Sequence, residues 1–124
     1  MKIKIFAVVA ALALVGVLAT GAEAGNKAKT KVTIKGEGGD YYGFVKSKDD
    51  PDRCANGREV IVYKLKGNGY DPKNDKEIGR DIAQANNDGY MWAIGNSGAK
   101  KGNYYAYTAK TKHCKSAVSK VISR

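Results

Sequence analysis

The stretch ANNDGYMWAIG, residues 85–95, joins four turn-forming residues to the segment that contains the single tryptophan of the chain. Asn, Asp and Gly favour tight reversals, and the pair Asp88-Gly89 is a strong short-range signal for a hairpin. Tyr90, Trp92 and Ile94 follow with the two-residue period of a strand. The stretch therefore predicts a hairpin turn that leads into a strand, with Trp92 in the core rather than at a ligand.

Six further segments have the period or the composition of a strand. Val32 and Ile34 alternate with polar residues, and residues 59–66 are rich in β-branched and aromatic side chains. Gly79 interrupts another segment, which predicts an edge strand or a bulged strand there. The predicted strands are residues 30–35, 41–47, 59–66, 76–83, 90–94, 103–110 and 117–122.

The connectors between these segments are rich in Gly, Pro, Asn and Asp, and no helical period separates them. Turn signals every 8 to 12 residues predict an all-β fold, a seven-stranded antiparallel β-sandwich over residues 30–124, after a flexible leader at residues 25–29. Leucine is nearly absent after residue 24, so aromatic side chains have to fill the core. We expect this role from Tyr63, Trp92, Tyr105 and Tyr107.

Residues 1–24 have the organisation of a secretory signal peptide. Lys2 and Lys4 precede an apolar run at residues 5–18, and Ala22 and Ala24 are small residues at the positions that a signal peptidase reads. The run is shorter than the roughly 18 to 20 apolar residues that cross a bilayer. We expect a signal-peptide helix that is cleaved and a secreted protein without a stable membrane anchor; an uncleaved anchor is the alternative. The extracellular medium, the periplasm and the cell wall all stay open as destinations.

Cys54 and Cys114 form an even pair in a chain expected to be exported, which predicts one disulfide bond. Closing a loop of about 60 residues stabilises a fold by roughly 4 kcal/mol in the chain-entropy model. A catalytic thiol would need an exposed basic partner, and the adjacent His113 is the one candidate. We therefore expect a structural role for both cysteines, in a monomer.

The chain is strongly basic. Its net charge is +10, and it becomes +9 when Lys2, Lys4 and Glu23 leave with the signal peptide. Such a charge attracts polyanions, although it also keeps an exported protein soluble. If the loop before residues 103–110 and the segment after them lie close together, they form one basic patch. The residues predicted to contact a polyanion are Lys100, Lys101, Lys110, Lys112 and Lys115.

Four short motifs occur in an order that resembles the carboxypeptidase regulatory-like domain. They are Gly43-x-Val45, Asn56-Gly57-x-x-Val60-x-Val62-Tyr63, Asp88-Gly89 with Trp92, and Gly102-x-x-Tyr105-Ala106. The resemblance spans residues 41–119 and is greatest to small secreted bacterial proteins in which this domain stands alone with one cysteine pair. It implies a transthyretin-like (prealbumin-like) Greek-key sandwich. The family places a buried aromatic where this chain has Met91, so the register of the strand that contains Trp92 stays open.

This resemblance implies a non-catalytic accessory or binding module without a cofactor. The enzymatic relative of the transthyretin fold, a purine-degrading hydrolase, relies on several histidines and a C-terminal Tyr-Arg-Gly-Ser. The present chain has one histidine, His113, and ends in Val121-Ile122-Ser123-Arg124. We therefore expect no enzyme of that type.

The acidic residues do not have the spacing of a metal site. Asp49, Asp50, Asp52 and Glu59 lack the Asp-x-Asp-x-Asp-Gly pattern of a calcium loop, and His113 has too few companions for zinc. We therefore expect no metal and no catalytic residue, and no residue recommends a small hydrolase. The expected function is a secreted, non-catalytic binding or structural role towards another secreted or cell-wall protein. The alternative is a cationic secreted protein that binds a cell-wall polymer, nucleic acid or a membrane surface.

Overall fold

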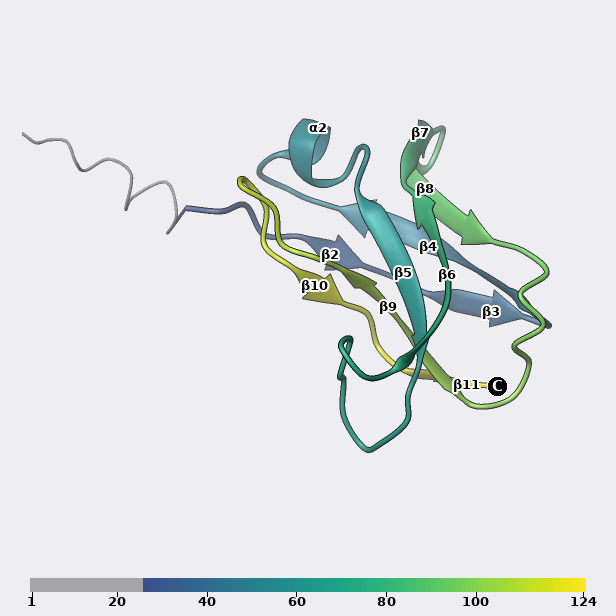
Figure 1. Ribbon diagram of the computed structural model, residues 1–124. Helices are drawn as coiled ribbons and strands as arrows, with labels where there is room; N and C mark the ends of the chain where they lie inside the picture. The colour runs from purple at the N-terminus through teal and green to yellow at the C-terminus, as the bar shows by residue number, and fades with distance from the viewer. Residues whose placement is uncertain (1–25) are drawn as a thin grey trace, which may run out of the picture.

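The structure is a computed structural model that describes residues 26–124, so the predicted signal peptide lies outside the described residues. The described chain is mostly β-structure with one short helix (Figure 1). Its elements are β2 (Lys31–Val32), β3 (Lys35–Glu37), β4 (Asp40–Lys46), α2 (Pro51–Cys54), β5 (Glu59–Lys64), β6 (Lys76–Ile82), β7 (Gln84–Asn86), β8 (Gly89–Ile94), β9 (Asn103–Thr108), β10 (Ala117–Val118) and β11 (Ile122–Ser123).

Residues 26–124 contain ten strand segments where the sequence predicts seven. The first predicted strand is divided into β2 and β3 because Phe44 N–H donates to the Thr33 hydroxyl, at 2.9 Å, in place of a backbone carbonyl. The last predicted strand is divided into β10 and β11 because its register on β9 shifts by one residue between them. The short strand β7 is a further segment that the sequence does not predict.

The strands form two antiparallel sheets. The β9 sheet has the order β10–β9–β5–β6, with β11 also paired to β9, and the β4 sheet has the order β2–β4–β8–β7, with β3 also paired to β4. The connections from β4 to β5, from β6 to β7 and from β8 to β9 therefore each pass from one sheet to the other. Buried residues of both sheets belong to one hydrophobic cluster, which includes Val45 and Trp92 from the β4 sheet and Val60 and Val62 from the β9 sheet.

The predicted effect of Gly79 is confirmed. Strand β6 is an edge strand, and its pairing with β5 shifts between Val62 and Tyr63, so β6 carries a bulge. A Cβ at position 79 would lie 2.9 Å from a methyl carbon of Ile94 in β8. Glycine therefore permits the close approach of the two sheets at this edge, where Asp81 accepts a hydrogen bond of 2.8 Å from Ala93 N–H.

The stretch at residues 85–95 forms the predicted hairpin. Strands β7 and β8 pair through Asn86 and Gly89, and Asp88 N–H donates to the Asn86 side chain at 2.8 Å inside the turn. Trp92 pairs with Gly43 of β4 and is fully buried. A Cβ at Gly43 would collide with the backbone carbonyl of Thr33, so glycine permits the close approach of that segment to β4. The register left open by the sequence therefore directs Trp92 inward.

The distribution of the tyrosines corrects the predicted core. Tyr41 and Tyr104 are fully buried in the core cluster, with ring centroids 4.9 Å apart. Tyr63 and Tyr105 are also buried but lie outside that cluster, because they alternate with core residues along β5 and β9 and so face the other side of the sheet. Tyr107, expected in the core, is half-buried on the same outer face.

The loop at residues 65–75 covers Tyr105 on this outer face. The ring of Tyr70 meets Tyr105 edge to face at 4.9 Å, and the Tyr105 hydroxyl donates to Asp75 at 2.6 Å. Asp75 also accepts hydrogen bonds from the backbone N–H groups of Lys66 and Asp71. The loop is thus organised around a buried carboxylate, which the turn composition alone does not indicate.

Candidate functional site

The two cysteines lie at disulfide distance. Their Sγ atoms are 1.98 Å apart and their Cα atoms 5.4 Å apart, and both residues are buried. Cys54 ends helix α2, which begins after Asp50; this carboxylate caps the helix by accepting from Arg53 N–H and binds the Arg53 side chain at 2.7 Å. The disulfide connects α2 to the turn that follows β9 and indicates a non-reducing environment.

Arg58 is buried beside the disulfide, with 4% of its surface exposed. Its guanidinium donates to the Thr30 hydroxyl and to the carbonyl oxygens of Cys54, Ala109 and Lys115, at 2.8–3.1 Å. Burial lowers the pKa of Arg58 from its ordinary value. None of the ion pairs in the described residues includes this side chain, so its charge adds to the positive potential of this end of the molecule.

The segment predicted as a flexible leader is partly held by the same region. Ala28 forms an isolated parallel bridge with Cys114: its N–H donates to His113 O at 2.9 Å, and its carbonyl accepts from Lys115 N–H at 2.8 Å. Lys27 Nζ donates to the carbonyl oxygens of Thr111 and of residue 112. The N-terminal segment thus extends the surface around the disulfide.

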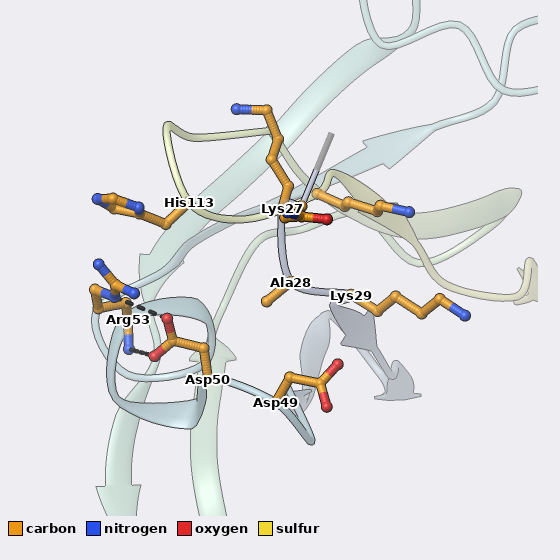
Figure 2. A pocket seen from close by; sticks show the side chains of 9 residues that line it. Lys27, Ala28, Lys29, Asp49, Asp50, Arg53 and His113 are labelled. Carbon is orange, nitrogen blue, oxygen red and sulfur yellow. Dashed lines mark hydrogen bonds and ion pairs between the residues drawn. The ribbon is translucent and has the colours of Figure 1, made fainter. Parts of the chain in front are cut away.

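A shallow hollow of about 390 Å³, here called the disulfide-end hollow, opens between this segment and α2 (Figure 2). It is lined by Asn26, Lys27, Ala28, Lys29, Asp49, Asp50, Arg53, His113 and Lys115. Figure 2 shows the Asp50 carboxylate directed at Arg53 and the His113 ring on the same side as Arg53. The hollow mixes both signs of charge, so its cations are partly compensated.

A second hollow of about 420 Å³, here called the lysine hollow, lies where β5 and β6 meet the loop at residues 95–102. Its lining residues are Lys64, Lys76, Ile78, Gly98, Ala99, Lys100, Lys101 and Tyr104. None of these described residues is acidic, in contrast to the disulfide-end hollow. The charged side chains of the lysine hollow are therefore all positive, whereas those of the disulfide-end hollow have both signs.

The sequence predicts a single basic patch only if the loop before β9 and the segment after it lie close together, and the structure does not meet this condition. Lys100 and Lys101 precede β9, whereas Lys110, Lys112 and Lys115 follow it. An extended strand rises about 3.3 Å per residue, so the two groups are roughly 20 Å apart. Figure 1 shows the two connections at opposite ends of β9. Lys115 belongs to the disulfide-end hollow, and Lys100 and Lys101 belong to the lysine hollow.

Sequence reasoning missed Lys64 and Lys76 as partners of Lys100 and Lys101. Strand pairing places Lys64 directly opposite Lys76. The signal in the sequence is a lysine at each end of the connection between two predicted strands. The loop and the bulge between these strands hide their register, so the pairing is readable only in the structure.

The lysines of the described chain are not paired with carboxylates. The three ion pairs among residues 26–124 are Arg53 with Asp50, Arg80 with Glu59 and Arg80 with Glu77, and all use arginine. The positive field of the lysines therefore extends into solvent, where it is available to an external polyanion.

Asp75 is a buried acidic residue, whereas Arg58 is a buried basic one. Burial raises its pKa, but the hydrogen bonds from Tyr105, Lys66 N–H and Asp71 N–H outweigh burial and hold the pKa below the ordinary value. Burial, together with this carboxylate, raises the pKa of the Tyr105 hydroxyl well above its usual range. Asp75 is thus an ionised structural acceptor for the loop at residues 65–75.

Within residues 26–124, no three His, Cys, Asp or Glu side chains gather as a metal site would require. In the same part of the chain, no helix has the length and apolarity to cross a bilayer. Comparison with protein-family models, with curated proteins and with solved structures yields no match for this chain. The candidate sites therefore rest on the geometry of the chain itself.

Proposed function

We propose that the chain is an exported, non-catalytic binding module with a transthyretin-like β-sandwich of the carboxypeptidase regulatory-like type. Support comes from the signal-like residues 1–24, from the disulfide between Cys54 and Cys114, and from two antiparallel sheets with a shared core. Strand passages between the sheets at three connections are compatible with a Greek key.

The buried ionisable groups support a scaffold role rather than a catalytic one. Arg58 donates its hydrogen bonds to a hydroxyl and three carbonyl oxygens. Asp75 accepts hydrogen bonds from a tyrosine hydroxyl and two backbone N–H groups. Groups engaged in this way hold loops together. Catalytic acids and bases instead need access to a reacting atom.

The polyanion-binding candidate has one specific observation in its favour. No lysine among residues 26–124 has a carboxylate of that same part within ion-pair distance, while all ion pairs of that part use arginine. In this second hypothesis, the module binds anionic polymers outside the cytoplasm, such as a cell-wall polymer, nucleic acid or an anionic membrane surface. A docking role towards another secreted protein is the competing reading.

Retention of the mature chain, residues 25–124, on immobilised DNA and on heparin separates these readings. Simple charge attraction weakens steeply as salt rises, so retention that persists at about 0.5 M salt would support dedicated polyanion binding. Elution already at about 0.15 M salt, together with recovery of a defined secreted partner in a pull-down, would support the docking role instead.

A further inference from the structure

The lysine hollow gathers like charges at a cost to stability. Lys64 and Lys76 are directly opposite each other in the β5–β6 pair, and like charges in that position destabilise a sheet. Lys100 and Lys101 enter the same hollow from the neighbouring loop. With no acidic side chain among the described lining residues, an anion from outside is the group that would relieve the repulsion.

Buried tyrosines hold the backbone of the loop at residues 95–102, which carries Lys100 and Lys101. The Tyr41 hydroxyl donates to Ala99 O at 2.5 Å, and the Tyr104 hydroxyl donates to Lys101 O at 2.7 Å. Both tyrosines are fully buried. A further backbone pair joins Gly102 and Arg124 through N–H···O contacts of 3.0 and 2.8 Å. The backbone is thus ordered before any ligand arrives, which lowers the entropic cost of binding.

Lys64 is positioned by the same loop. A Cβ at Gly102 would lie 2.6 Å from Lys64 Cε, so the lysine side chain lies against the bare glycine backbone. Gly102 has φ +129°, a conformation that other residues rarely adopt. Lys64 is half-buried, unlike the three exposed lysines of the hollow. Its ammonium is therefore held at the site by packing.

The lining suits phosphate groups better than nucleobases. Lysine ammonium groups bind phosphate as point charges. Tyr104 is the aromatic residue of the lining, but it is fully buried and offers no ring face on which a base could stack. We propose that the lysine hollow binds the phosphate groups of a repeating phosphate polymer through Lys64, Lys76, Lys100 and Lys101. This site deepens the polyanion-binding candidate and depends on it.

Two triple variants of equal net charge test the site. K76Q/K100Q/K101Q removes the exposed cations of the lysine hollow, and K110Q/K112Q/K115Q removes three exposed lysines at the opposite end. The probes are linear inorganic polyphosphate and a single-stranded oligodeoxynucleotide with the same number of phosphates, at about 0.1 M salt. Thermal unfolding of both variants verifies that each is folded.

The site predicts that the hollow variant loses at least about tenfold in affinity for both probes, and the control variant less than about threefold. Equal losses in the two variants would overturn the site while leaving general polyanion binding intact. A loss confined to the oligonucleotide would also overturn it, because the contact would then involve sugar or base. If the unmodified protein binds neither of the two probes, both the site and the polyanion-binding candidate are overturned.

Discussion

Replacement of Arg58 by Met should be among the most damaging single substitutions in this protein. Arg58 is 4% exposed, and its guanidinium joins four segments: the N-terminal segment, the end of α2, the residues after β9 and those before β10. Met matches the aliphatic stem of Arg and keeps the packing of that part. The change therefore removes the guanidinium together with its four hydrogen bonds.

The magnitude follows from the acceptors that remain. R58M leaves three carbonyl oxygens and the Thr30 hydroxyl without their donor, and each buried unsatisfied group costs about 1–3 kcal/mol. Water can reach some of these groups, because only Cys54 O is bonded in a fully buried contact. Removing the cost of burying the charge offsets part of the loss. We expect a net destabilisation of about 3–4 kcal/mol, against a total stability of about 5–15 kcal/mol for a domain of this kind.

Urea unfolding followed by tryptophan fluorescence measures this effect, because Trp92 is the single tryptophan and is fully buried. R53M is the matched control: Arg53 is exposed in the same region and has one salt bridge to Asp50, so its loss should cost less than about 1 kcal/mol. A destabilisation by R58M no larger than that of R53M would refute the assignment of Arg58 as the organiser of this end.

Three further predictions concern the disulfide, the buried carboxylate and the lysine pair. The double variant C54S/C114S should lose roughly 4 kcal/mol in urea unfolding, and reduction of the unmodified protein should reproduce that loss; no change on reduction would contradict it. Because the pKa of Asp75 is lowered by folding, its stabilisation is present above its ordinary value of 3.8 and is lost as the pH falls below it. Unfolding between about pH 3 and pH 7 should therefore show a smaller pH dependence for D75N than for the unmodified protein, and identical slopes would disprove this. K76Q should stabilise the protein by about 0.2–1 kcal/mol at low salt by removing the repulsion from Lys64, an effect that should vanish in high salt.

The sequence predicts the strands well where one residue pattern determines one outcome. The Asp88-Gly89 signal locates the hairpin, and Gly79 locates the bulged edge strand, because each depends on local backbone conformation. The pairing of Cys54 with Cys114 follows from there being two cysteines. Predictions of this kind need no knowledge of distant contacts.

Features that depend on which face of a strand a residue occupies are harder to predict from the sequence. The run NYYAYT places Tyr104 inward and Tyr105 outward, but both faces of β9 are covered, so both residues are buried and the alternation does not reveal the core. The second cover is the loop around Asp75, whose role depends on a hydroxyl 30 positions along the chain. The sequence pattern holds no record of such contacts.

The basic patch illustrates the same limit for the candidate site. Charge and spacing identify Lys100 and Lys101 as candidates, but grouping them with Lys110 required the ends of β9 to meet, which an extended strand prevents. Their actual neighbours, Lys64 and Lys76, come together through strand register. Composition thus predicts that a basic surface exists, and topology determines which lysines share it.

The proposed role requires that the chain leaves the reducing cytoplasm and forms its disulfide outside it. The intact mass of the protein recovered from outside the cytoplasm, measured without reduction and after thiol alkylation, tests this most directly. We expect the mass of residues 25–124 with no alkylated thiol. A full-length mass, or a product with both Cys54 and Cys114 alkylated, would contradict it.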